Sequence, residues 1–166
     1  AAQAALGADV RLVLPGWPEV MAHADGLPEV FAEDNPPGGA PARVVYGALD
    51  GLGVTAYVVD CPDLFGVEGH PYLDESGRDR LGHDRRFGLL SWTTARLGMG
   101  ADRFWRPDLV HAHDWQAGLT PLYLDLLADC IGSSPGDGRP AAAGRRPATV
   151  ITIHNLAYQG LFGAEA

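Results

Sequence analysis

The chain has 166 residues, of which 46% are hydrophobic and 20% charged, a composition typical of a single globular domain with its own core. Its net charge of −9 argues against a nucleic-acid partner, because binding to phosphates requires a basic surface. No apolar run approaches the roughly 20 residues that cross a bilayer, so we expect no membrane partner.

The first third of the chain alternates β-rich runs with glycine- and proline-rich segments. Residues 1–7 have the pattern of a helix that ends at a glycine, so we expect the chain to begin inside an element. The predicted strands cover residues 10–14, 43–46 and 54–59. Asp50 and Gly51 predict a hairpin turn before the last of these strands, and residues 26–41 predict an exposed loop.

The middle of the chain predicts an irregular polar segment followed by one amphipathic helix. Residues 62–82 show no helical or strand pattern. Asp84 can cap a helix that runs to about Leu97, because Asp is a favoured N-cap residue. Residues at helical spacing predict one buried face of this helix: Phe87, Leu90, Thr94 and Leu97.

The last third predicts a strand, a helix, a loop and a final strand. The strands cover residues 108–112 and 148–153, the latter rich in β-branched side chains. A helix is predicted from Gln116 to about Ala128, with an apolar stripe of Leu119, Leu122, Leu126 and Leu127. Residues 131–147 are rich in Gly, Pro, Ser and Ala and predict a flexible surface loop.

This alternation of strands and helices predicts the fold class. We expect an α/β domain with a Rossmann-like parallel sheet flanked by helices and joined by right-handed crossovers. The chain has no Gly-x-Gly-x-x-Gly turn, which argues against a dinucleotide-dependent oxidoreductase.

Polar residues follow the last two predicted strands directly. Asp114 comes just after one strand, and His154 comes just after the other. If the two strands are parallel neighbours, their axes lie about 4.8 Å apart. Ligands of open α/β sheets bind at the carboxyl ends of the strands. The sequence therefore predicts that Asp114 and His154 line one crevice.

Asp114, Trp115 and Tyr72 each have an ordinary structural role as well as a candidate role in binding a ligand. Asp114 can act as the N-cap of the following helix, a role compatible with function. Trp115 suits a carbohydrate ligand because sugar C–H groups stack on aromatic rings, although a lone tryptophan more often packs in a core. Tyr72 lies in a predicted loop and could reach a ligand, with plain packing as the alternative.

A metal site is a competing hypothesis for the same stretch. His111, His113 and Asp114 are residue types that bind zinc, as in a zinc hydrolase. We expect the two histidines to point to opposite sides of their strand, with one of them a hydrogen-bonded interior residue. That expectation disfavours a metal site.

Two long motifs stand out in the chain, Arg106–Gly118 and then Thr152–Phe162. In sequence and order they resemble the bacterial glycogen synthase and plant starch synthase family. Arg11–Gly16 and Arg86–Trp92 also match. The similarity covers nearly the whole chain apart from residues 131–147.

The resemblance implies a fold, an activity and a set of substrates. Members are retaining glucosyltransferases of two Rossmann-like domains, the GT-B arrangement, that move glucose from ADP-glucose to the non-reducing end of an α-1,4-glucan. No cofactor or metal is implied beyond the donor substrate. Residues 1–166 would form a single, truncated, acceptor-side N-terminal domain. The first strand with its Lys-Thr-Gly-Gly loop and the C-terminal nucleotide-binding domain would lie outside the chain.

By motif match, the resemblance also implies residue roles. Asp114 corresponds to the active-site aspartate, and His154 corresponds to the histidine that contacts the transferred sugar. The implied substrate-binding residues are Tyr72, Trp115, Gln116 and Asn155. Two positions depart from the family pattern, since His83 stands in place of an asparagine and many bacterial members have histidine at the position of Gln116.

The charged residues limit what the chain could do alone. All 12 basic residues are arginine, and the balance is acidic. A departing nucleoside diphosphate needs cationic stabilisation, so we expect the chain to be inactive without the second domain. A glucan-binding module without catalysis is the alternative. The two cysteines, Cys61 and Cys130, do not form a disulfide framework and favour a cytoplasmic protein.

Overall fold

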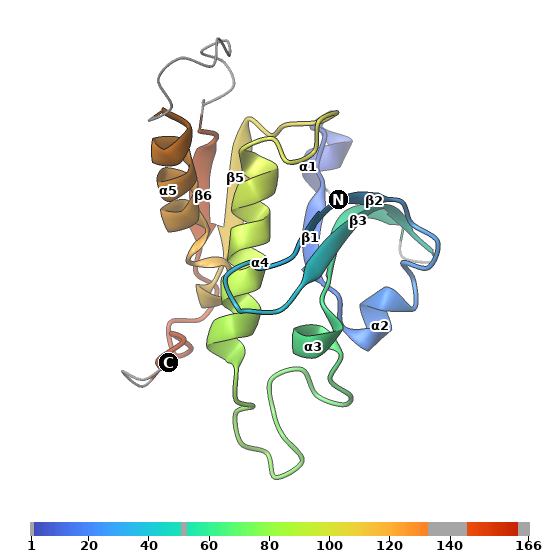
Figure 1. Cartoon of the computed structure of the whole chain (residues 1–166), viewed down its shortest axis with the longest axis vertical. Coiled ribbons are helices and arrows are strands. Elements are labelled where there is room, and N and C mark those ends of the chain that lie inside the picture. Colours follow the sequence, from blue (N-terminus) through green and yellow to red (C-terminus); the bar gives the residue numbers. More distant parts are fainter. Residues whose placement is uncertain (1, 51–52, 133–145, 163–166) are drawn as a thin grey trace.

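The computed structural model describes residues 2–50, 53–132 and 146–162, and contains two sheets (Figure 1). The larger sheet has four strands in the order β1-β4-β3-β2, and the smaller pairs β5 with β6. The strands are β1 Leu12–Pro15, β2 Glu29–Glu33, β3 Ala42–Leu49, β4 Val54–Asp60, β5 Leu109–His113 and β6 Ala148–Thr152. The helices are α1 Ala2–Ala5, α2 Pro18–Met21, α3 Pro62–Phe65, α4 His83–Gly98, the 3₁₀ turn η1 Trp115–Ala117 and α5 Thr120–Gly132. No helix in the described ranges is long and apolar enough to span a bilayer.

The larger sheet is mixed rather than parallel. β1 runs parallel to β4, whereas β3 is antiparallel to both β4 and β2. The predicted hairpin between β3 and β4 is confirmed by their antiparallel register, although its tip at residues 51–52 lies outside the described residues. The prediction of a loop over 26–41 is wrong at β2, whose backbone pairs with β3. The glycines and prolines on both sides of this short edge strand concealed it in the sequence.

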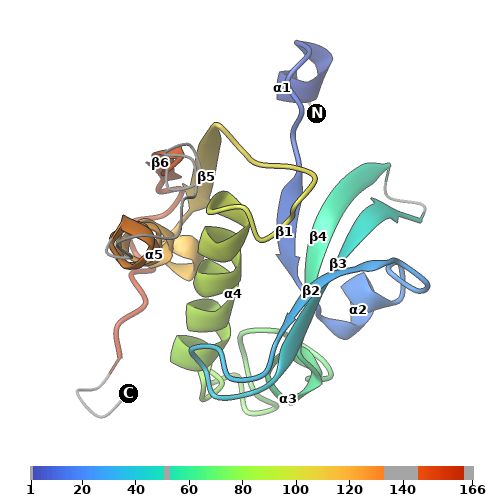
Figure 2. The ribbon, with the colours of Figure 1, turned by 45° about the horizontal axis from the view of Figure 1, so that its top comes forward.

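Helix α4 packs against both sheets and lies between them in two views (Figures 1 and 2). Phe87 and Leu90 join a core cluster with Val59 of β4. Near the other end of the helix, Ala95 packs with Val110 of β5. The predicted helix is therefore confirmed. Its cap is not, since the N-cap is Gly82 in a left-handed conformation (φ 82°), a region that favours glycine.

Asp84 lies instead within the first turn of α4, where a carboxylate complements the helix dipole.

The last helix, α5, also differs from its prediction. It begins at Thr120, after the 3₁₀ turn. The predicted apolar stripe is wrong at Leu119, Leu122 and Leu126, which are 43%, 52% and 49% exposed, whereas Leu124 is fully buried. Most of the predicted loop at 131–147 lies outside the described residues.

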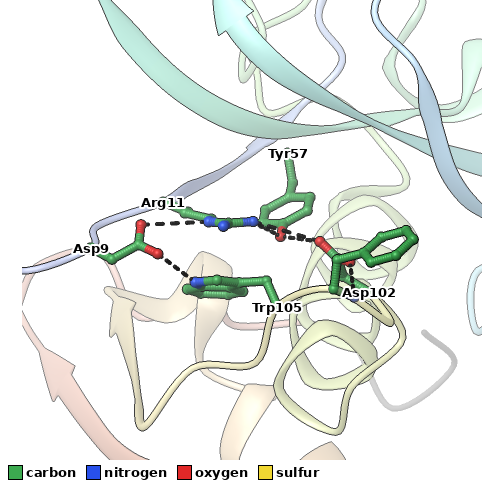
Figure 3. Close-up of polar contacts among 6 residues, drawn as sticks. Asp9, Arg11, Tyr57, Asp102 and Trp105 are labelled. Atoms are coloured by element: carbon green, nitrogen blue, oxygen red, sulfur yellow. Dashed lines mark hydrogen bonds and ion pairs between the residues drawn. The ribbon is translucent and has the colours of Figure 1, made fainter.

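A cluster of polar and aromatic side chains ties the loop after α4 to the larger sheet (Figure 3). Arg11 donates a hydrogen bond of 2.7 Å to the Tyr57 hydroxyl, which donates one of 2.7 Å to Asp102. The Arg11 guanidinium lies 4.3 Å from the ring centroid of Trp105, whose indole N–H donates to Asp9 at 2.7 Å. Burial and the bond to Asp102 raise the pKa of Tyr57, so its hydroxyl stays protonated.

This cluster predicts the effect of removing one hydroxyl. Tyr57→Phe leaves buried Asp102 without its hydroxyl donor, so we expect the free energy of unfolding to fall by about 1–3 kcal/mol. Urea denaturation of the intact protein measures this. Tyr46→Phe is the matched control, because its ring lies over the same guanidinium and the ring is retained. Equal stability of the two variants would contradict the role given to the Tyr57 hydroxyl.

Candidate functional site

Asp114 and His154 meet where β5 and β6 leave the sheet. The two strands are parallel, as the sequence predicts, and His113 pairs with Thr152 in their register. The backbone N–H of Asp114 donates to the Thr152 carbonyl at 2.8 Å. The backbone N–H of His154 then donates to the Asp114 carboxylate at 2.6 Å. The predicted proximity of Asp114 and His154 is therefore present in the structure.

The backbone of Asp114 is strained. With φ 54° and ψ −169°, it is the single non-glycine residue of positive φ within the described ranges. Such a conformation is nearly restricted to glycine and costs about 1–3 kcal/mol, so it persists only where the surroundings enforce it. The side chain makes no capping bond to η1, which excludes the simple N-cap role. Its carboxylate is held toward the end of β6 instead.

Three histidines form a row along this edge. The rings of His111 and His113 stack with centroids 4.2 Å apart, and both side chains are exposed. The prediction that they point to opposite sides is wrong, because residues two apart in a strand share a face. Nδ1 of His113 lies 3.0 Å from Nε2 of His154, and Nε2 of His111 lies 2.7 Å from the Thr152 hydroxyl.

No group of three or more His, Cys, Asp or Glu residues is placed to hold a metal ion in the part of the chain that the structure describes. Each residue of the zinc hypothesis makes a contact with a protein atom. His113 contacts His154, and His111 contacts Thr152. The third candidate ligand, Asp114, accepts the His154 N–H.

Partial burial and the neighbouring histidines lower the pKa of His113, the central member of the row. Partial desolvation of His113 is the main cause, followed by the charges of His111 and His154, while Asp114 acts in the opposite direction. A histidine with a lowered pKa binds protons more weakly when folded than when unfolded. The folded state is therefore destabilised as the pH falls below the unfolded-state pKa of about 6.5, and the loss is complete once the pH has passed through the lower folded-state pKa.

We expect His113 to titrate below pH 6.5 in the folded protein. NMR observation of its ring resonances across a pH series measures this value directly. His111→Leu removes one neighbouring positive charge and should move the His113 pKa upward. A His113 pKa at or above 6.5 in the unsubstituted protein would contradict the geometry of the row.

Tyr72 and Gln116 also come together, although they are far apart in sequence. The Gln116 side-chain amide donates to the Tyr72 hydroxyl at 3.4 Å. The Tyr72 ring packs on Phe87, with centroids 5.9 Å apart, and its residue is 36% exposed. His83 donates from Nε2 to the Tyr72 carbonyl at 3.0 Å. The sequence assigned no partner to His83, and its buried position at the start of α4 becomes evident only in the fold.

A buried arginine anchors the loop that carries Tyr72. The Arg86 guanidinium donates to the carbonyl of Leu64 at 2.6 Å and to that of Leu81 at 2.7 Å, near the two ends of the loop. Within the loop, Nδ1 of His70 accepts the backbone N–H of Tyr72 at 3.2 Å. The segment predicted to be irregular is thus held by specific hydrogen bonds.

Trp115 packs against other aromatic residues and is only partly exposed. Its ring meets Phe87 edge-on, with centroids 4.8 Å apart, and also contacts Phe162 at 5.8 Å. Gly160, at φ 60°, lies so close that an added Cβ would be 2.4 Å from the Trp115 ring. Asn155 is exposed and accepts the Ala157 N–H at 2.9 Å, shaping the turn after β6. Sugar contacts by these two residues stay a prediction.

Comparisons with known proteins match this arrangement to one family. The family model for the starch synthase catalytic domain matches residues 1–166. The chain belongs to this family. Glycogen synthase of Paramagnetospirillum magneticum is 45% identical over 164 residues, covering 98% of this chain and 30% of that protein. Glycogen synthase of Leptothrix cholodnii is 43% identical over 164 residues, covering 96% and 31%.

The chain therefore spans about 30% of the length of these curated relatives. A solved structure, the catalytic domain of starch synthase IV from Arabidopsis thaliana bound to ADP and acarbose, aligns with a TM-score of 0.66. It covers 96% of this chain and 29% of that one, at 22% identity, and so shows a shared fold. The resemblance inferred from the sequence to the starch synthase family is confirmed.

Proposed function

We propose that the chain forms the acceptor-side half of the active site of a retaining glucosyltransferase. The enzyme would move glucose from ADP-glucose to the non-reducing end of an α-1,4-glucan. Membership of the starch synthase family supports this activity. The observation that carries it is the contact between His154 N–H and the Asp114 carboxylate at 2.6 Å, at the joined ends of β5 and β6.

The chemistry of glucosyl transfer suits this pair. Bond breaking builds positive charge on the sugar, so a carboxylate held near it stabilises the transition state. The strained Asp114 backbone indicates that its carboxylate is positioned at a cost that the fold tolerates. His154 would bind the transferred sugar through its ring. Tyr72 and Gln116, which already touch each other, would bind substrate beside them, together with Trp115 and Asn155.

The rest of the active site would come from a second, C-terminal domain in a GT-B arrangement. The chain carries a net charge of −9 and no lysine, so we expect the second domain to supply the main cationic contacts to the departing diphosphate. We propose that the chain is inactive alone and that it needs no cofactor besides its donor substrate. Both cysteines are free, which supports the proposed cytoplasmic location.

The sheet arrangement supports a further strand of the complete domain. β1 pairs with β4 along one edge, and β5 pairs with β6 along one edge. Within the described residues, the other edge of β1 and the other edge of β5 are unpaired. Both strands lie beside α4 (Figure 2). A parallel strand between β1 and β5 would join the two sheets into one Rossmann-like sheet and satisfy both edges. We assign that position to a strand that precedes residue 1.

The proposal predicts losses of activity with retained folding. In the intact enzyme, Asp114→Asn and His154→Ala should each lower kcat/KM about 100-fold or more, because each removes a group that stabilises the reacting sugar. Incorporation of labelled glucose into glycogen measures this. Asp25→Asn, in an exposed turn, is the matched control for the charge change. Near-normal transfer by both site variants would refute the assigned roles.

A glucan-binding module is the alternative, favoured by the exposed Tyr72 and its contact with Gln116. One experiment distinguishes the enzyme from the binding module. The intact protein would bind maltooligosaccharides in either case. Turnover of ADP-glucose by the unsubstituted protein, lost in Asp114→Asn, supports the enzyme, whereas binding without turnover supports the module.

A further inference from the structure

We propose that His113 is a positioning residue that holds the His154 imidazole and determines which of its nitrogens faces the substrate. This inference rests on the proposed function and assigns a role to a residue that the motif comparison leaves without one. Nδ1 of His113 and Nε2 of His154 are 3.0 Å apart, within hydrogen-bond distance. The rings are nearly parallel, with an interplanar angle of 17° and centroids 5.3 Å apart.

Hydrogen-bond chemistry gives this contact a direct consequence. A neutral imidazole has one N–H donor and one acceptor nitrogen, so one of the two facing nitrogens donates and the other accepts. Whichever donates, Nε2 of His154 is engaged by His113. Among the described residues no hydrogen bond reaches Nδ1 of His154. Nδ1 is therefore the nitrogen that His154 would present to a sugar hydroxyl.

The surroundings of His113 make it a suitable support. His113 lies in β5, where its backbone pairs with Thr152 of β6. The His111 ring stacks on the His113 ring on the same face of the strand. His111 is itself held by the Thr152 hydroxyl at 2.7 Å. The row thus extends from the strands to His154, whereas His154 lies in the exposed segment after β6. An imidazole in such a segment needs a contact from a regular element to keep one orientation.

The contact also limits protonation. Two imidazolium rings cannot share it, because both facing nitrogens would carry hydrogens. The charged groups around His113 are His111 from β5, His154 from the segment after β6, and the Asp114 carboxylate. The contact therefore holds while at least one of the two facing nitrogens lacks a hydrogen.

The test uses the intact enzyme with His113→Leu, which removes the ring nitrogen, and His113→Asn, whose amide occupies nearly the position of Nδ1. ¹⁵N shifts of the His154 ring report its tautomer without any turnover. We expect one dominant tautomer in the unsubstituted enzyme and in His113→Asn, and a mixture in His113→Leu. Loss of one hydrogen bond should lower kcat/KM about tenfold in His113→Leu, with recovery in His113→Asn.

Two controls separate positioning from general damage. His111→Leu removes the stacked imidazole but keeps Nδ1 of His113 opposite His154, so it should leave the His154 tautomer unchanged. In a His154→Ala background, adding His113→Leu should cause no further loss, because a residue that acts through His154 has no effect without it. An additive loss, or an unchanged His154 tautomer in His113→Leu, would overturn the inference. Absence of glucosyl transfer in the unsubstituted enzyme would instead overturn the proposed function, while the tautomer measurement would still test His113.

Discussion

The parallel pairing of β5 with β6 is the constraint on which the candidate site depends. Its register sets His113 against Thr152 and lets both strands end at the same edge. Asp114 then turns into a strained backbone conformation and accepts the His154 N–H. Each of these contacts joins residues about 40 positions apart in the sequence. Because side chains alternate between the two faces of a strand, shifting the register by one residue would turn the histidine row to the opposite face and separate Asp114 from His154.

Helix α4 transmits that constraint to the rest of the site. It packs on the larger sheet through Phe87 and on β5 through Ala95. Its first turns also carry His83, which holds Tyr72, and Arg86, which closes the Tyr72 loop. Trp115 packs edge-on against Phe87 of the same helix. The two halves of the site, Asp114 with His154 and Tyr72 with Gln116, are thus supported by one element and its neighbours.

The distribution of charge agrees with the proposed function. This chain contributes a carboxylate, imidazoles and hydroxyl or amide groups, all suited to binding a sugar. It is acidic overall and carries no lysine. Under the proposed function, a separate cationic surface would stabilise the departing diphosphate.

The sequence by itself determined the strands other than β2, helix α4 and the placement of Asp114 and His154. The last follows because polar residues that end apolar strands mark the open edge of a sheet. Strand periodicity also required His111 and His113 to share a face, contrary to the prediction made from it. Tertiary structure alone decided the pairing of β2, the contact of Tyr72 with Gln116, and the packing around Trp115. These depend on backbone pairing and on contacts between distant segments, and neither leaves a local pattern in the chain.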